Sequence, residues 1–190
     1  MTKGRLETFT DGVIAIILTI MVLELHVPEA ATFEALRPLV PVFLSYVLSF
    51  LVLGTYWNNH HHVFAGADRV SGGVMWANLH LLFWLSLIPF VTSWMGERSF
   101  AAVPVAAYGV VLGCAGMAFY IMVRQLVALH GPDSVLARAF KGDWKSPLSL
   151  LLYTAGIAVS FFEPLLGFAL YWSTNAIWLV PDRRVERARG

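Results

Sequence analysis

Residues 5–25 read RLETFTDGVIAIILTIMVLEL, in which a short polar and charged group is followed by a long apolar run. No charged residue lies between Asp11 and Glu24. A helix that crosses the hydrocarbon core of a bilayer needs about 20 mainly apolar residues. We therefore expect residues 8–25 to form a membrane-spanning helix. Its length and the absence of a suitable small-residue cleavage site argue against a cleavable signal peptide, so we expect it to be retained.

The composition of the whole chain supports the same environment. Of the 190 residues, 58% are hydrophobic and 13% are charged, whereas soluble domains carry about 25% charged residues. We expect an all-α integral membrane protein with a single domain over residues 1–190. The net charge of +1, without a concentrated basic face, argues against binding to nucleic acid. Cys114 is the only cysteine, which excludes a disulfide framework or a thiolate metal cage within one chain.

Six segments approach the length of a membrane span. The expected helices cover residues 8–25, 39–60, 74–95, 103–127, 147–162 and 165–180. The last two are separated at Glu163-Pro164, because proline opposes helix continuation at the residue before it. One long kinked helix is the alternative for this pair.

The distribution of Lys and Arg predicts the orientation of the chain. An even number of spans puts both termini on one side of the membrane, and that side would hold all but two of the basic residues. These are Lys3, Arg5, Arg69, Arg124, Arg138, Lys141, Lys145, Arg183, Arg184, Arg187 and Arg189, against Arg37 and Arg98 on the other side. Because cytoplasmic loops are enriched in Lys and Arg, we expect both termini to be cytoplasmic, with the protein in the plasma or inner membrane.

Polar residues inside the predicted spans are candidates for function, because such groups are costly in lipid. They gather at Arg5, Thr10 and Asp11, at residues 57–62, and at Asn78 and His80. Asp11 also fits the ordinary role of an acidic residue at the start of a helix. The depths of Asp11, His60 and Asn78 are similar, so a hydrogen-bonded network could join the first three helices.

The consecutive histidines His60, His61 and His62 raise the alternative of metal or haem ligation. Adjacent residues point about 100° apart on a helix, so the three cannot all face one ion. A metal site would need a partner such as His26, His80 or His130 from elsewhere in the chain. We expect no metal site here.

One face of the first helix is almost entirely apolar. At about 100° per residue, it collects Phe9, Gly12, Ile16, Thr19, Ile20 and Leu23. Asp11 lies on the opposite flank. Such a stripe is equally typical of helix packing or lipid contact, so the pattern alone does not indicate a pore.

Four motifs together resemble those of the transmembrane protein 175 potassium channels, in their single-repeat prokaryotic form. The motifs are Arg5-x-x-x-Phe9-Thr10-Asp11-Gly12, Trp57-x-Asn59-His60-His61, Trp76-x-Asn78 and Leu85-x-Leu87-Ile88-Pro89-Phe90. Thr10 departs from the family pattern, which usually has serine there, but it keeps the hydroxyl. The resemblance covers nearly the whole chain.

The resemblance implies a homotetramer in the membrane, with four copies of the first helix around a potassium-permeable pore and no cofactor beyond the permeant ion. By register, Ile16, Ile20 and Leu23 match the family's apolar constriction, and Thr19 matches a polar layer that can help to coordinate an ion. Asp11 matches an acid that holds the first helix against the next two, with Trp57, His60 and Asn78 as its partners and Arg5 and Thr10 in the same network. An apolar constriction can gate by dewetting. Potassium sheds water more easily than sodium, which would explain selectivity.

Two other functions compete with a channel. A proton-coupled secondary transporter could use Asp11 and His60, although the inverted repeats common in transporters are not found. A membrane enzyme finds no support, because the chain carries no nucleophile–base motif and no phosphate-binding loop.

Overall fold

The structure is a computed structural model that describes residues 2–179, and within that range it contains helices and loops but no strand. The predicted all-α class is confirmed. The helices are α1 (Lys3–Leu23), the 3₁₀ helix η1 (Glu34–Leu39), α2 (Val40–Ala65), α3 (Gly72–Ser86), α4 (Ile88–Glu97), α5 (Ala102–His130), α6 (Val135–Ala139), α7 (Lys145–Ser160) and α8 (Pro164–Leu179).

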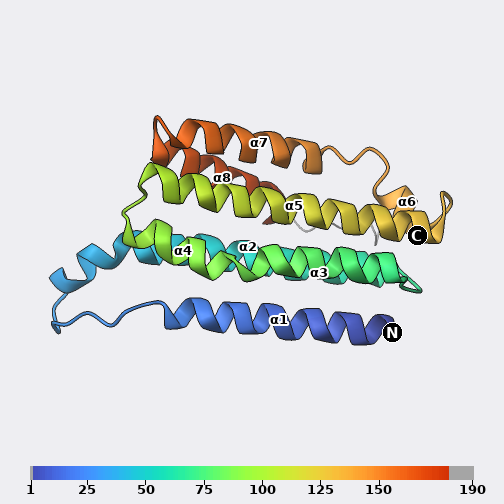
Figure 1. Ribbon diagram of the computed structural model, residues 1–190, viewed down its shortest axis with the longest axis horizontal. Coiled ribbons are helices and arrows are strands. Elements are labelled where there is room, and N and C mark those ends of the chain that lie inside the picture. The colour runs from blue at the N-terminus through green and yellow to red at the C-terminus, as the bar shows by residue number, and fades with distance from the viewer. Residues whose placement is uncertain (1, 180–190) are drawn as a thin grey trace.

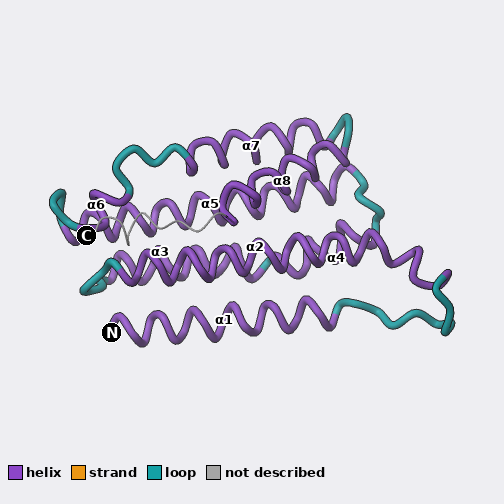
Figure 2. Tube along the Cα trace, turned by 180° about the vertical axis from the view of Figure 1, so that it is seen from behind, coloured by secondary structure: helices purple, strands orange, loops and turns teal. Residues whose placement is uncertain are grey.

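The long helices run side by side in an elongated bundle (Figure 1). Helix α1 lies along one edge and packs against α2, α3 and α4. Helices α5, α7 and α8 form the opposite side. Seen from behind, the loops lie at the two ends of the bundle, apart from the short break between α3 and α4 (Figure 2). We call the end where α1 begins and α5 finishes the amino-terminal end.

Four helical stretches are long and apolar enough to cross a membrane: Lys3–Leu23, Glu34–Ala65, Gly72–Glu97 and Ala102–His130. Helices α7 and α8 have 16 residues each, which makes them about 24 Å long. A bilayer core is about 30 Å thick. A full crossing by this last pair therefore stays a prediction. The two are separate antiparallel helices, and not one kinked helix.

The third expected span, residues 74–95, is divided into α3 and α4. Helix α3 ends at Ser86 and α4 begins at Ile88, with Pro89 in its first turn. Proline has no N–H to donate to the preceding turn, so the regular hydrogen-bond ladder is interrupted here. The two short helices still follow one another along the bundle (Figure 1).

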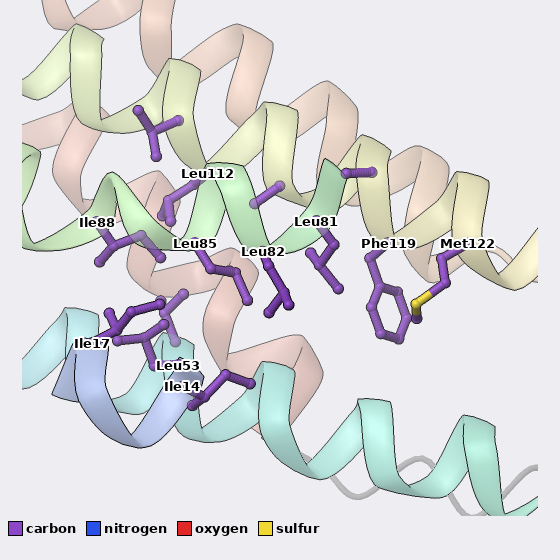
Figure 3. Close-up of a cluster of buried hydrophobic side chains, with 14 of the residues drawn as sticks. Ile14, Ile17, Leu53, Leu81, Leu82, Leu85, Ile88, Leu112, Phe119 and Met122 are labelled. Carbon is purple, nitrogen blue, oxygen red and sulfur yellow. The ribbon is translucent and has the colours of Figure 1, made fainter. Parts of the chain in front are cut away.

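The core forms where α3 is packed between α1 and α5. Leu82 and Leu85 of α3 lie toward Ile14 and Ile17 of α1, and Leu81 follows them further along α3 (Figure 3). All five are at most 5% exposed. Burial of this one face of α1 fixes its rotation about its own axis, which decides the residues on the opposite face.

Candidate functional site

The outer face of α1 is apolar and unpartnered in a single copy of the chain. Ile16 is 60% exposed, Ile20 42% and Leu23 80%, whereas Ile17 and Met21 on the inner face are at most 3% exposed. Phe9 and Gly12 are also exposed. Contiguous apolar surface of this kind faces lipid or another protein surface.

Thr19 is the polar member of this face. Its hydroxyl donates to the carbonyl oxygen of Ile16, with 2.8 Å between the oxygens. Because the proton is used within the helix, the hydroxyl oxygen keeps lone pairs for an acceptor role on the exposed side. Hydroxyl and carbonyl oxygens are suitable ligands for an alkali cation.

The inner face of α1 carries a buried polar chain across three helices. The amide nitrogen of Asn78 in α3 donates to Thr10 Oγ1 at 2.9 Å, and Asn78 Oδ1 lies 3.0 Å from His60 Nε2 in α2. All three side chains are at most 3% exposed. With the Asn78 amide placed this way, His60 donates its Nε2–H to the Asn78 oxygen. If any one of the three helices moved away, a buried polar side chain would be left without its hydrogen-bond partner.

Asp11 lies beside this chain and not in it. Its Oδ1 accepts the indole N–H of Trp57 at 3.0 Å, and both residues are exposed. The structure thus brings Asp11 to Trp57 as expected from the resemblance. It is Thr10, however, that contacts the buried Asn78–His60 pair. The Arg5 side chain is exposed and makes no hydrogen bond or ion pair within residues 2–179.

A second polar group lies at the opposite end of α1 and was not identified from the sequence. Ser93 Oγ of α4 lies 3.3 Å from Glu24 Oε2 and 3.1 Å from Glu97 Oε1. These residues line one end of an open groove between α1 and α4 that also contains Ile16 and Ile20. The spacing of Ser93 and Glu97, one helical turn apart beside another exposed acid, is the signal that could have indicated it.

His80 and His130 make separate contacts. His80 Nε2 accepts the indole N–H of Trp84 at 2.9 Å, and His130 accepts the backbone N–H of Asp68 at 3.0 Å. Within the described part of the chain, no three His, Cys, Asp or Glu side chains come close enough to hold a metal ion. His60, His80 and His130 thus act as hydrogen-bonding groups.

Helix α1 therefore has two distinct faces. The inner face is fixed by apolar packing and by the Thr10–Asn78–His60 chain, and the outer face presents branched apolar side chains with one hydroxyl layer. The outer face is therefore an apolar surface with one exposed hydroxyl, which is free to contact lipid, further protein or ions.

Comparison with known proteins agrees with this arrangement. Residues 5–89 match the family model described as endosomal/lysosomal potassium channel TMEM175. A protein of Chryseobacterium sp. (strain P1-3), named a potassium channel, is 48% identical over 188 residues that cover 99% of this chain and 98% of that protein. An endosomal/lysosomal proton channel TMEM175 of Gallus gallus is 28% identical over 150 residues. The match covers 71% of this chain and 30% of that protein.

A solved structure has the same fold. The crystal structure of a lysosomal potassium-selective channel TMEM175 homolog from Chamaesiphon minutus superposes with a TM-score of 0.82, covering 95% of this chain and 97% of that one. The two sequences are 24% identical, so this likeness concerns the fold alone.

Proposed function

This chain belongs to the TMEM175 family of potassium channels, and we propose that four copies of it enclose a pore lined by the outer face of α1. The single observation that carries the proposal is the exposed apolar face of α1 with Ile16, Ile20 and Leu23, opposite a face that is firmly packed. One α1 cannot enclose a pore, whereas four around an axis can. As a member of a family of ion channels, the protein is not an enzyme.

The apolar side chains act as the gate and the selectivity element. Rings of Ile16, Ile20 and Leu23 exclude water when they close together, so that the pore stops conducting without a physical plug. When the rings widen slightly, an ion passes only after it loses part of its water. Potassium holds its water less tightly than sodium and crosses at lower cost, and the Thr19 hydroxyl oxygens replace part of the lost hydration.

The inner face of α1 keeps the pore in shape. The Thr10–Asn78–His60 chain and the Trp57–Asp11 hydrogen bond oppose rotation of α1, which would turn the apolar face away from the axis. We place the channel in the plasma or inner membrane, with the amino-terminal end of the bundle cytoplasmic. The charge asymmetry of the sequence supports that orientation.

The test is bilayer recording under mixed potassium and sodium conditions, with Ile16→Asn compared with the unchanged protein. An amide ring hydrates the constriction, so the potassium-over-sodium permeability ratio falls several-fold and the reversal potential moves accordingly. Leu151→Asn is the matched control, because Leu151 on α7 is 65% exposed, much like Ile16, but lies on a different helix. An unchanged reversal potential in Ile16→Asn contradicts the proposal.

Proton permeation is the second candidate, favoured by the name of the Gallus gallus relative. In the same recordings, a pH gradient at symmetric potassium shifts the reversal potential by about 59 mV per pH unit if protons alone carry the current. Measuring potassium flux from liposomes distinguishes a channel from a proton-coupled transporter. An uncoupler that collapses the proton gradient leaves channel flux intact and stops coupled transport.

A further inference from the structure

A pocket of about 480 Å³ lies on the side of the bundle away from α1, between α2, α5, α7 and α8. Its walls include Gly113 and Gly116 of α5, Tyr153 of α7 and Asn175 of α8. Pockets of about 300–1,000 Å³ are the usual size of small-ligand sites. Nothing in the proposed pore requires this pocket, because α1 does not line it.

The pocket exists because α5, α7 and α8 touch closely at one end and separate toward the other. Away from the amino-terminal end, Gly109 and Gly156 pack against the ring of Tyr171, and a Cβ at Gly156 would lie 2.5 Å from Tyr171 Cε1. Further along α5 there is more space. A Cβ at Gly113 would lie 3.5 Å from Tyr153 Cβ, and one at Gly116 would lie 3.7 Å from Tyr56 Oη, which are ordinary contacts.

One deeply buried polar side chain of the pocket, that of Asn175, has an unused hydrogen-bonding group. Asn175 is 3% exposed, and its Oδ1 lies 3.3 Å from Thr55 Oγ1, while its Nδ2 has no partner within the described residues. Rotating the amide would exchange the two roles but would still leave one atom unpaired. Asn59 and Tyr153 also line the pocket and make no side-chain hydrogen bond within residues 2–179, but their polar atoms are not fully buried.

Unpaired polar groups at this depth need an explanation. More than about 90% of buried polar groups in native structures have a hydrogen-bond partner. Leaving one unmet is destabilising. The unpaired Asn175 amide, with the accessible polar groups of Asn59 and Tyr153 beside it, points to a bound molecule that carries its own polar atoms.

The rest of the lining indicates an amphiphile with an acidic group. Val52, Met117 and Leu150 give the pocket apolar walls, and the last two are about 40% exposed, so the pocket opens sideways between α5 and α7. Arg124 and Asp143 also line the pocket, and Arg124 lies on the part of α5 nearer the amino-terminal end. The ammonium of Lys145 lies 5.3 Å from the ring centre of Trp178, another lining residue.

We infer that this pocket binds an anionic phospholipid. Arg124 binds the phosphate, while Asn59 and Asn175 hydrogen-bond the glycerol ester region. The first methylenes of an acyl chain lie along Gly113, Gly116 and Met117, and the chain leaves between α5 and α7 into the bilayer. Arg124 and Gly116 are eight residues apart on α5, about 12 Å along its axis. The charged head group and the start of the acyl chain can therefore contact the basic and the apolar part of the pocket at the same time.

The test uses the full-length protein, purified in mild detergent, stripped of lipid, and titrated with phosphatidylglycerol or phosphatidylcholine. Native mass spectrometry counts retained lipid, and thermal unfolding measures stabilisation. We expect retention of phosphatidylglycerol, with a preference over phosphatidylcholine of about fivefold, since one basic residue near an anionic head group contributes roughly that factor. Arg124→Gln removes most of the preference.

Two variants separate the pocket from the rest of the lipid-facing surface. Gly116→Leu places bulk in the pocket, and its Cβ would meet only ordinary contacts. Asn175→Leu removes the polar anchor, and both variants should lose the retained lipid. Ser173→Leu is the control, because Ser173 is exposed on the same helix and bonds only the Ala169 carbonyl. The inference is overturned if the unchanged protein and the Gly116→Leu, Asn175→Leu and Ser173→Leu variants all retain the same amount of lipid. A cryo-EM map that shows only water or residues 180–190 in the pocket, or equal stabilisation by soluble glycerol phosphate, also overturns it.

Discussion

Two threonines on α1 have opposite environments, which separates an anchoring residue from the proposed ion contact. Thr10 is fully buried and accepts from Asn78, whereas Thr19 is exposed and bonds only to the carbonyl of its own helix. Both carry the same hydroxyl and methyl groups. Their different surroundings therefore predict different consequences for one and the same substitution.

Thr10→Val removes the acceptor of Asn78 Nδ2 without changing side-chain volume, and leaves that buried donor unpaired. We expect a loss of about 1 kcal/mol of stability, the usual scale for buried hydrogen bonds between membrane helices. Thr19→Val should leave thermal unfolding unchanged and lower potassium conductance, because it removes only an oxygen on the outer face. Equal loss of stability in the two variants would show that Thr10 is not an anchor.

Asp11 is predicted to be a structural acceptor and not a source of negative potential in the pore. Asp11→Asn keeps an oxygen that can accept the Trp57 indole N–H, so potassium-over-sodium selectivity and stability should both stay close to normal. Asp11→Leu lacks an acceptor and should lower the unfolding temperature. A reversal potential that moves in Asp11→Asn would show that the carboxylate charge itself acts on the ion.

At the scale of the helix, the sequence predicted where apolar segments lie but not how each one is rotated. Apolar length and Pro164 predicted six helical segments, of which the third is divided into α3 and α4. Helical periodicity put Ile16, Ile20 and Leu23 on one face, and all three are exposed together. Periodicity could not decide whether Thr10 or Asp11 faces α3. Neighbouring residues differ by about 100°, and only the packed partner helices fix the rotation.

Short elements were missed for a related reason. Helices η1 and α6 have six and five residues, too few to show a period in the sequence. The break at Leu87 falls inside a continuous apolar run, so length alone suggested one helix. The sequence contains Pro89 in this run, but sequence alone does not distinguish a proline that kinks one helix from a proline in the first turn of a second helix.

The contact of α5, α7 and α8 gives a prediction at the level of the element. Gly156→Ala places a methyl 2.5 Å from Tyr171 Cε1, so Tyr171 or the helix must move. We expect a loss of about 1–3 kcal/mol, as for other overpacked cores, read as a lower unfolding temperature. Gly116→Ala on α5 meets only ordinary contacts and should be tolerated. Equal behaviour of the two variants would mean that these helices are not closely packed at Gly156.

At the scale of the whole molecule, the asymmetry of the bundle favours a symmetric assembly. Helix α1 lies at one edge and contacts other helices on one side only, so its exposed apolar face is available for further copies. Closed rotational symmetry repeats that face around an axis without leaving an open edge. In such an assembly the same α1 residue of every copy would face the shared axis, which a monomer cannot reproduce.

Ile16→Cys, made with Cys114→Ser to remove the only natural thiol, should create a ring of thiols around the pore axis. Thiolates are soft ligands that bind soft divalent metals strongly, and several converging on one ion bind more tightly than one. We expect micromolar cadmium to block the potassium current and a thiol-specific chelator to restore it. In chains joined in tandem, the block should weaken as fewer copies carry the cysteine. Leu151→Cys in the same background is the control, because its side chain lies on α7, away from α1. If cadmium acts equally on both variants, or if one cysteine per assembly blocks as well as four, Ile16 does not face a shared axis.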